Sequence, residues 1–523
     1  MYCSVLHVAI EGGPATFGGL GNVASQMMVA QNQFKLNDQH AFDASIITPY
    51  YPTLFKSYND KIQIAEIQHV YNNTLVTSKI YLKQHNGIKH YLIEPADAYK
   101  YLFNINALHD IYLDTEASLF IERLKYYNGA VAAYVANGPI GTNHPNPQIL
   151  QLHDWQAALA PKLLTGVYNN TTIKTVFMVH IDNWDRGTYP GYCLEGIGLE
   201  YLPETCILKA MGLAAADQIV VVSPRLLEEC IDTYSDDPEL EYLRKIYTIA
   251  NARKTAIGIT NGINYANYCP VGKLISDPQN IYTEKLRLKQ QLATMLNGSR
   301  GTWRINPDLP LILYVGRYSP EKGVDTFEQL IQALHGRAIF IGIGRSITDD
   351  VYNVVLNYSR QMDNIFVTFS EAEQSRFLQL VRAAADFIYV PSRREACGLV
   401  APEGLANGAI CITTGVGGIR DLITTFDYSD PNNTYGNGIF FEVFPEGEEN
   451  PDLYKAIDQA LLLWDSLTPA QKNAMQIRIM HEAEQFDWQA PGGSLQKYLD
   501  VFIKLLEPEN LTPNCVLKPI FQP

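Results

Sequence analysis

The chain has 523 residues, of which 47% are apolar and 18% charged, and its formal net charge is −15. This composition is typical of a globular protein with at least two domains, and it excludes the disordered and fibrous classes. The acidic balance argues against nucleic acid or an anionic membrane as the main partner, although it leaves room for a local basic pocket.

No apolar run reaches the ~18 residues that a membrane helix needs, so we predict no membrane span. The first residues, MYCSVLHVAIEGG, lack a basic region and a cleavage site, and they are typical of a first β-strand rather than a signal peptide. The eight cysteines are scattered without a C-x-x-C pair, which argues against structural zinc and disulfides. We therefore predict a cytoplasmic protein with no metal site.

Short β-branched runs alternate with helical segments along the chain. In the first half we expect strands at 4–10, 149–154 and 175–180 and helices at 19–34 and 155–164. In the second half we expect strands at 311–317, 337–344, 385–391 and 408–414 and a helix at 323–334. Continuous apolar strands are buried on both faces, which indicates parallel sheets covered by helices and hence an α/β doubly wound fold.

The alternation restarts after an Asn261-Gly262 turn and a polar stretch that continues to about Pro310. We predict a Rossmann-like domain at 1–262, a second at 263–485, and a crossover helix with a tail at 486–523. The closing helix is expected from about Ser494, followed by an irregular tail after Glu507. Two doubly wound domains facing one another would place the ligand in the cleft between them.

The first glycine loop, GGPATFGGLGNVA, contains a G-x-G-x-x-A match from Gly19 to Ala24, with Asp43 at about the dinucleotide-fingerprint distance. This match favours a nicotinamide-dependent oxidoreductase as one alternative. The eight residues between Ile10 and Gly19 are, however, too many for the tight turn of that fingerprint.

Two further strands of the first half end in polar residues. His153 and Asp154 end one strand, and His180 ends another. A single strand-end histidine is more often structural, but two at neighbouring strand ends favour a functional role.

In the second half, Arg317 and Lys322 lie five residues apart between a strand and the helix expected from about Val324. Two cations beside a helix N-terminus can bind an anion, although two surface charges on a loop are equally compatible with the pattern. Gly417 and Gly418 follow a later strand and open a helix, so they either admit a phosphate or simply turn the chain.

The segment VPSRREACGLVAPEGLANGAI (390–410) holds Glu395 and Glu403. Pro402 belongs in the first turn of a short helix, since deeper in a helix it would cost about 3 kcal/mol. Two acids here could be a catalytic pair, a metal site, a sugar clamp or a solvated helix start. Carboxylates accept hydrogen bonds from hydroxyl pairs, which suits a sugar, whereas Glu403 could equally complement the helix dipole.

Several segments in order resemble the glycogen and starch synthase family of retaining glycosyltransferases, whose GT-B fold has two Rossmann-like domains with an interdomain cleft. The similar segments are VAIEGGPATFGGLGNVA, LHDWQAALAP, LKAMGLAAADQIVVVSP, ITNGIN, GRYSPEKGVD, PSRREACGL and FDW, and they cover nearly the whole chain.

The resemblance implies a role for each candidate residue. Glu395 would hold the donor sugar's hydroxyls beside the amides of Cys397, Gly398 and Leu399, and Glu403 would bind the ribose. Arg317 and Lys322 would neutralise the leaving diphosphate. Asp154 and His180 would contact the hexose, and Gly18, Gly19, Gly417 and Gly418 would let the backbone approach the phosphates. No cofactor is implied beyond the nucleotide sugar as substrate.

The chain departs from the family at four places. Thr16 stands where the family has lysine, IDNWDRG replaces the segment after His180, Val416 replaces a threonine, and Ala396 replaces a proline. The donor is therefore left open among ADP-, UDP- and GDP-linked sugars.

Our first hypothesis is a retaining hexosyltransferase that moves a sugar, expected to be glucose, from a nucleotide sugar to a glycan such as an α-1,4-glucan. The alternatives are a catalytically impaired relative and a transferase acting on another hydroxyl acceptor, protein included.

Overall fold

The structure is a computed structural model, and it describes residues 2–85, 87–112, 117–137, 147–181, 186–199, 201–297, 304–344, 357, 362–368, 370–426 and 435–507. The chain divides into two compact units, 1–261 with 491–523 (unit 1) and 262–490 (unit 2). The tail predicted after Glu507 lies outside the described residues.

Unit 1 is built on a nine-stranded sheet within the described residues, in the order β13-β12-β9-β8-β1-β4-β7-β6-β5. The seven strands from β13 to β7 pair in parallel, whereas β5, β6 and β7 pair antiparallel. The strand bounds are β1 Cys3–Val8, β4 Phe42–Pro49, β5 Ile62–Tyr71, β6 Thr74–His85, β7 Ile88–Glu94, β8 Ile149–His153, β9 Lys174–Val179, β12 Gln218–Val221 and β13 Ala256–Gly258. Two small antiparallel pairs are β2 (Lys35–Leu36) with β3 (Gln39–His40) and β10 (Thr188–Pro190) with β11 (Thr205–Ile207).

Unit 2 contains six described strands, all parallel, in the order β16-β15-β14-β17-β18-β19. Their bounds are β14 Leu311–Val315, β15 Ile339–Ile343, β16 Ile365–Val367, β17 Phe387–Val390, β18 Ile410–Thr413 and β19 Gly438–Phe440. Every residue of β15, β17 and β18 is buried, as is every residue of β8 and β9 in unit 1. Successive side chains of a strand point to opposite faces, so these strands are covered on both faces, as the apolar runs predict.

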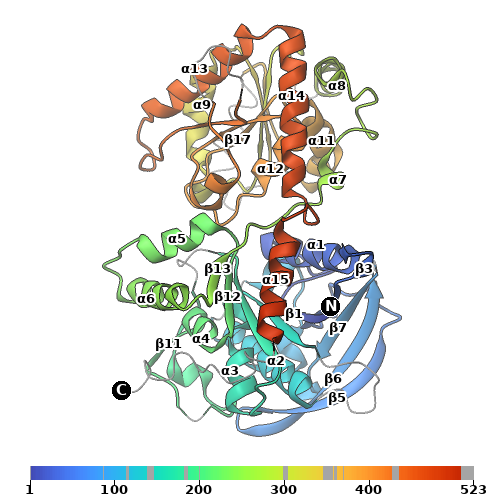
Figure 1. Cartoon of the computed structure of the whole chain (residues 1–523), viewed down its shortest axis with the longest axis vertical. Helices are drawn as coiled ribbons and strands as arrows, with labels where there is room; N and C mark the ends of the chain where they lie inside the picture. The colour runs from blue at the N-terminus through green and yellow to red at the C-terminus, as the bar shows by residue number, and fades with distance from the viewer. Residues whose placement is uncertain are drawn as a thin grey trace. The chain divides into compact units, whose positions relative to one another are not determined.

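The helices that cover the two sheets follow the strands along the chain (Figure 1). In unit 1 they are α1 Gly19–Gln33, α2 Ala117–Asn137, α3 Leu159–Gly166, α4 Leu208–Ala215, α5 Pro224–Asp232, α6 Pro238–Ala252 and α15 Ser494–Leu506. In unit 2 they are α7 Tyr265–Tyr268, α8 Ile281–Leu296, α9 Phe327–Leu334, α11 Glu371–Ala384, α12 Val400–Leu405, α13 Pro451–Ser466 and α14 Pro469–Ala483. The short 3-10 helices are η1 Asp97–Phe103, η2 Leu108–Ile111, η3 Trp155–Ala157, η4 Gly191–Leu194, η5 Pro320–Lys322, η6 Val324–Thr326, η7 Gly417–Asp421 and η8 Glu484–Phe486.

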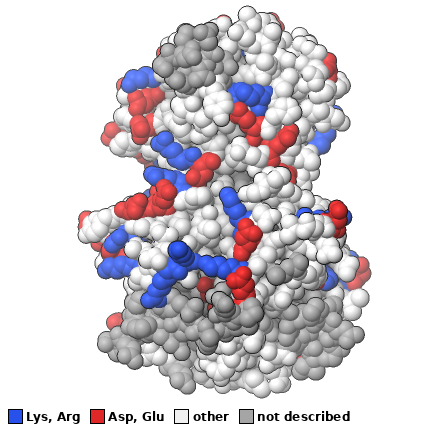
Figure 2. Space-filling model, viewed as in Figure 1, with Lys and Arg blue, Asp and Glu red and all other residues white. Residues whose placement is uncertain are grey.

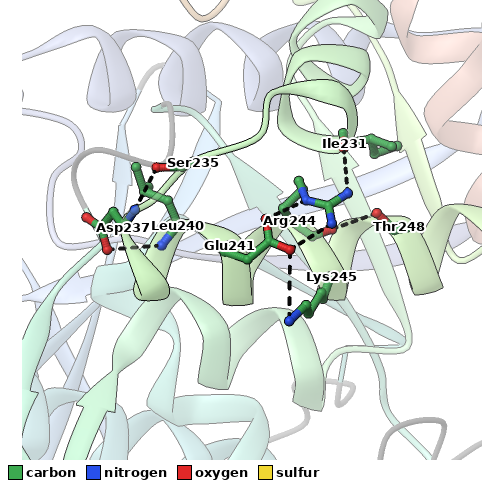
Figure 3. Close-up of polar contacts among 8 residues, drawn as sticks. All are labelled: Ile231, Ser235, Asp237, Leu240, Glu241, Arg244, Lys245 and Thr248. Atoms are coloured by element: carbon green, nitrogen blue, oxygen red, sulfur yellow. Dashed lines mark hydrogen bonds and ion pairs between the residues drawn. The ribbon is translucent and has the colours of Figure 1, made fainter.

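Helix α6 shows how local sequence sets a helix start (Figure 3). The Asp237 carboxylate accepts hydrogen bonds from the Glu239 and Leu240 amides at 2.9 and 3.5 Å, and Pro238 takes the first helical position. One turn on, Glu241 pairs with Arg244 at 2.7 Å, and Arg244 also donates to the Ile231 carbonyl in α5. The cap satisfies amides that have no partner inside the helix, and the ion pair lies at helical spacing.

Helix α15 returns the chain to unit 1 and begins at Ser494, as predicted. Ser494 Oγ donates to the Thr260 carbonyl at 2.6 Å, and the Phe502 ring meets the Phe42 ring edge-on at 6.1 Å. The helix contacts β1, and Figure 1 shows this red segment among the blue and cyan elements of the first half. The last helix is therefore part of the unit formed by the first 261 residues.

Charged side chains of both signs are interspersed on the face seen in Figure 2. Throughout the portion of the chain that the structure describes, no helix is both long enough and apolar enough to cross a membrane.

Candidate functional site

In unit 2 the predicted residues gather at the carboxyl ends of adjacent strands. From β14 the chain continues to β15 and β16 on one side of the sheet, and then to β17 and β18 on the other. In open parallel sheets, ligands bind where the strand order reverses in this way. The loops after β14 and β17, which carry Arg317, Lys322 and Glu395, flank this point.

Lys322 and Glu395 form an ion pair across these two loops. Lys322 Nζ donates to Glu395 Oε2 at 2.6 Å, and Ser392 Oγ donates to the same oxygen at 3.1 Å. The two side chains are 24% and 19% exposed, so the pair is reachable from solvent. A charge-assisted bond of this length fixes the position of the carboxylate.

Arg317, the second predicted cation, pairs with Glu321 of the same loop. Its side chain is 52% exposed. An exposed pair contributes only about 0–1 kcal/mol, because water solvates both ions well when they separate. The guanidinium is therefore held loosely and can turn to another anion.

Gly417 and Gly418 begin η7 and pack against the backbone that carries Glu395. A Cβ at Gly417 would collide with the Glu395 carbonyl oxygen, and one at Gly418 would lie 2.6 Å from the Ala396 carbonyl oxygen. The Gly418 amide donates to the Glu395 carbonyl at 3.3 Å. These glycines thus have a packing reason that is independent of any phosphate, and their contact with phosphate stays a prediction.

Cys397, Gly398 and Leu399 connect this backbone to α12. Gly398 has φ +81°, which favours glycine, and a Cβ there would lie 3.1 Å from Glu395 Cγ. Leu399 caps α12, which begins at Val400, so Pro402 lies in the first turn as predicted.

Glu403, the second acid, pairs with Arg382 of α11 at 2.5 Å. Both side chains are 12% exposed. Burial raises the pKa of Glu403, and the adjacent Arg382 guanidinium opposes that shift. The carboxylate is thus held by a largely buried cation, and its bond to a ribose stays a prediction.

In unit 1 the corresponding reversal of strand order lies between β1 and β8. The loop after β1 is organised by Glu11, a fully buried carboxylate. It accepts hydrogen bonds from the Phe17 and Gly18 amides at 2.6 and 3.0 Å and from the Tyr112 hydroxyl. A carboxylate at the start of α1 is favourable because the amides there carry partial positive charge.

The other predicted residues of this loop adjoin Glu11. Thr16, which stands where the family has lysine, donates through Oγ1 to the Gly13 carbonyl at 2.9 Å. A Cβ at Gly19 would meet no described atom within 4 Å, so this side of α1's first turn is open.

Asp154 is fully buried and has φ +60°, a strained value for a residue other than glycine. One carboxylate oxygen accepts from the Trp155 amide at 2.8 Å, and the other accepts from the His180 and Ile181 amides at 3.0 Å each. Lys209 Nζ lies 3.7 Å from the first oxygen. Asp154 therefore holds the backbone at His180, and the two predicted residues lie together.

His180 lies beside His153, with 2.9 Å between His180 Nε2 and His153 Nδ1. Burial lowers the pKa of His180 to about 4, with Asp154 opposing the shift and Lys209 adding to it. Burial also lowers the pKa of His153 well below its ordinary value. Both rings are therefore neutral near pH 7.

The nicotinamide alternative does not fit this geometry. Asp43 lies at the amino-terminal end of β4, which is the opposite sheet edge from the glycine loop, and it pairs with Lys89 at 3.0 Å. A ribose-binding acid of the dinucleotide fingerprint belongs at the edge where the strands end. The fingerprint match was a false one.

Sequence reasoning missed Glu11, Arg382 and Lys209. An acid directly before a glycine loop is a usable signal, because the loop's amides need an acceptor. Arg382 and Lys209 had no local signal, since their partners lie 21 and 55 positions away in the chain.

Comparison with known proteins finds two family models that match the chain. Residues 4–245 match the family described as "Starch synthase catalytic domain", and residues 299–476 match "Glycosyl transferases group 1". The chain is 27% identical to a glycogen synthase of Histophilus somni, covering 95% of this chain and 99% of that one. It is 26% identical to a glycogen synthase of Edwardsiella ictaluri, covering 96% and 100%.

The chain belongs to the glycogen and starch synthase family. It is therefore a glycosyltransferase, as the ordered segments predicted. The catalytic domain of starch synthase IV from Arabidopsis thaliana, solved with ADP and acarbose, superposes with a TM-score of 0.77 at 20% identity, covering 97% of this chain and 100% of that domain. The synthase fold of this chain is thus GT-B, as expected.

Proposed function

We propose that this synthase transfers glucose, with retention of configuration, from ADP-glucose to an α-1,4-glucan. The Lys322–Glu395 pair at the strand-order reversal of unit 2 carries the proposal. The glycogen synthases among its relatives support glucan as the acceptor, and the ADP in the related starch synthase structure supports adenine as the donor base.

Lys322 and Arg317 neutralise the departing diphosphate in this proposal. Arg317 leaves its exposed pair with Glu321 at little cost, and its planar guanidinium can bind two phosphate oxygens at once. Lys322 supplies a compact charge from the same loop, beside Glu395. Lys322 is fixed before the reaction and can stabilise charge that develops on the leaving group without reorganising, whereas Arg317 must first turn away from Glu321.

Glu395 accepts hydrogen bonds from the donor sugar's hydroxyls, beside the backbone of Cys397, Gly398 and Leu399. Lys322 and Ser392 orient this carboxylate before the donor binds. In unit 1, His180 contacts the hexose, and Asp154 supports it by fixing its backbone. Gly19 leaves the start of α1 accessible to phosphate, whereas the Gly18 amide is held by Glu11 and shapes the loop there.

The decisive experiment incubates the full chain with ADP-, UDP- or GDP-glucose and glycogen, and measures nucleoside diphosphate release and glucan growth. We expect ADP-glucose to be used best. Reactions without glycogen measure donor hydrolysis, and Glu395→Gln, which keeps the shape but removes the charge, controls for contaminating activity.

A catalytically impaired relative is the second candidate, because Thr16 offers a hydroxyl where the family has an ammonium. Tight binding of ADP without turnover of any of the three donors would favour this candidate. Nucleotide release without glucan growth would instead direct attention to a different hydroxyl acceptor.

A further inference from the structure

Three histidines of unit 1 form a continuous hydrogen-bonded chain across neighbouring strands. His7 lies on β1, His153 ends β8, and His180 follows β9, and these strands are adjacent in the sheet. His7 Nδ1 lies 2.8 Å from His153 Nε2, and His153 Nδ1 lies 2.9 Å from His180 Nε2. The rings are stacked, with centroids 5.1 and 5.0 Å apart.

The far end of this chain is Gln31, near the end of α1. Its Oε1 lies 2.8 Å from His7 Nε2, and its side chain is fully buried, as are His7 and His153. Gln31 Nε2 is buried without a hydrogen-bond partner among the described residues. The chain thus runs from a buried amide to His180, which is only partly buried.

Each ring is neutral near pH 7. Burial lowers the pKa of His7 to about 4 and that of His180 to about 4, and it lowers the pKa of His153 well below its ordinary value. A neutral imidazole has one donor nitrogen and one acceptor nitrogen. Each hydrogen bond needs one of each, so the proton position in one ring fixes the position in the next.

The order of atoms then gives one rule for all three rings. Gln31 Oε1 can only accept, so His7 carries its proton on Nε2 and accepts at Nδ1. His153 Nε2 must therefore donate to His7, and His180 Nε2 must donate to His153. His180 is left with Nδ1 as an acceptor. Rotating the Gln31 amide by half a turn would reverse every bond and leave His180 with an Nδ1 proton.

We propose that Gln31 is a positioning residue that sets the tautomer of His180 through His7 and His153. In this arrangement His180 Nδ1 accepts a hydrogen bond from a hydroxyl of the hexose. The inference rests on the proposed function only in that last contact, because the tautomers themselves follow from the hydrogen-bonded chain.

The test measures the ring nitrogens of the full-length protein labelled with ¹⁵N-histidine, by long-range ¹H–¹⁵N correlation near neutral pH. Single histidine substitutions assign the three rings. We expect His7, His153 and His180 all to show the Nε2–H pattern. A neutral ring that carries its proton on Nδ1 in any of the three histidines, or a protonated ring, would overturn the proposal from the wild-type spectrum alone.

Gln31→Met then removes the acceptor while keeping the length of the side chain. We expect His180 to lose its pure Nε2–H pattern and kcat for ADP-glucose to fall about two- to tenfold, the effect of one misplaced neutral hydrogen bond. Gln151→Met is the matched control: Gln151 is also fully buried, in β8 beside His7, but it bonds to Met27 and Met178. An unchanged His180 tautomer pattern in Gln31→Met would show that Gln31 does not set the tautomer of His180.

A third arm separates this inference from the proposed function. ADP-glucose is added to the labelled wild-type protein, and the His180 Nδ1 shift is followed. If all three histidines carry the Nε2 proton and His180 Nδ1 does not respond to the donor, the result supports the hydrogen-bonded histidine chain and contradicts the hexose contact. If the three histidines show mixed tautomers in a protein that turns over ADP-glucose, the result supports the proposed function and contradicts the hydrogen-bonded histidine chain.

Discussion

The carboxylate of Glu395 has a cation beside it before any sugar nucleotide arrives, 2.6 Å away at Lys322. A donor therefore meets a preformed pair rather than two free side chains, and its diphosphate must share the lysine with the glutamate. The exposed Arg317–Glu321 pair differs, because a diphosphate can simply replace Glu321.

Both cations are proposed to neutralise the departing diphosphate, which leads to one prediction for the two. Lys322→Ala and Arg317→Ala should each lower kcat by about 10²–10³-fold, as expected when one cationic contact to the charge that develops on the diphosphate is lost. Activity should persist in excess EDTA, because Lys322 and Arg317 supply the charge that a metal would otherwise provide. Initial rates on ADP-glucose measure both effects.

Glu321→Gln is the matched control for the cations, since it frees Arg317 without removing it. Its rate should equal or exceed that of the wild type. If EDTA inhibits the enzyme fully, Mn²⁺ restores its activity and both alanine variants remain active, a bound metal rather than Lys322 and Arg317 neutralises the diphosphate.

Glu403 requires a gentler substitution than alanine. Removing its carboxylate would leave the Arg382 guanidinium buried without its partner, which costs about 3–5 kcal/mol of folding stability. Glu403→Gln keeps an acceptor for Arg382. We expect it to weaken ADP binding about tenfold or more, because a ribose hydroxyl bonded to a charged acceptor contributes roughly 1.5–3 kcal/mol.

Calorimetric titration with ADP measures this change, and Arg382→Lys tests whether the ion pair also affects the affinity. An unchanged ADP affinity in Glu403→Gln, together with a lower unfolding midpoint, would show that Glu403 serves only the ion pair.

At the scale of elements, the apolar runs predicted strands β1, β8, β9, β14, β15, β17 and β18 and their parallel arrangement, because fully buried strands need cover on both faces. The antiparallel hairpin of β5 and β6 was not anticipated, although its pattern was readable: from Ala65 to Tyr71 every second residue is buried. Such alternation is typical of a strand that is half exposed.

The site was predictable only in part. Residues placed at strand ends by short motifs, such as Arg317, Lys322 and Glu395, could be located in the fold because the motif and its position coincide, and their functional roles stay predictions. Contacts between distant segments, such as Arg382 with Glu403 or Gln31 with His7, depend on how helices pack on the sheet. No local pattern in the sequence encodes those contacts.

Helix α15 gives a prediction at this scale. Phe502 is fully buried against Phe42, so Phe502→Ala should lower the free energy of unfolding by about 3–5 kcal/mol. Urea denaturation followed by circular dichroism measures the loss. Lys497→Ala, at an exposed position of the same helix, should change the midpoint little, and equal midpoints for the two variants would mean that α15 does not stabilise unit 1.

At the scale of the molecule, buried neutral histidines couple folding to pH. Burial lowers the pKa of His7 to about 4 and the pKa values of His69 and His90 to about 3, from an ordinary value of 6.5. Below pH 6.5 these histidines therefore bind protons in the unfolded chain but stay neutral in the folded chain. Stability should fall as the pH drops from about 6.5 toward about 4, by about 1.4 kcal/mol per pH unit for each histidine.

Urea midpoints measured between about pH 7 and pH 5 check this slope. His69→Phe is the informative variant, because both ring nitrogens of His69 are buried without partners among the described residues. The variant should bind about one proton fewer on unfolding, so its unfolding free energy should depend less steeply on pH. An identical slope in the variant would mean that other groups cause the pH dependence.

Because unit 1 contains both the first 261 residues and the last helix, the order of synthesis matters. At ~5–20 residues per second, a ribosome needs on the order of tens of seconds to make the intervening unit. During that time Phe42 lacks its contact with Phe502 and Met178 lacks its contact with Tyr498, because both partners lie on α15. The first unit to emerge is thus the last to be completed, and a chain released early would expose apolar surface where α15 should lie.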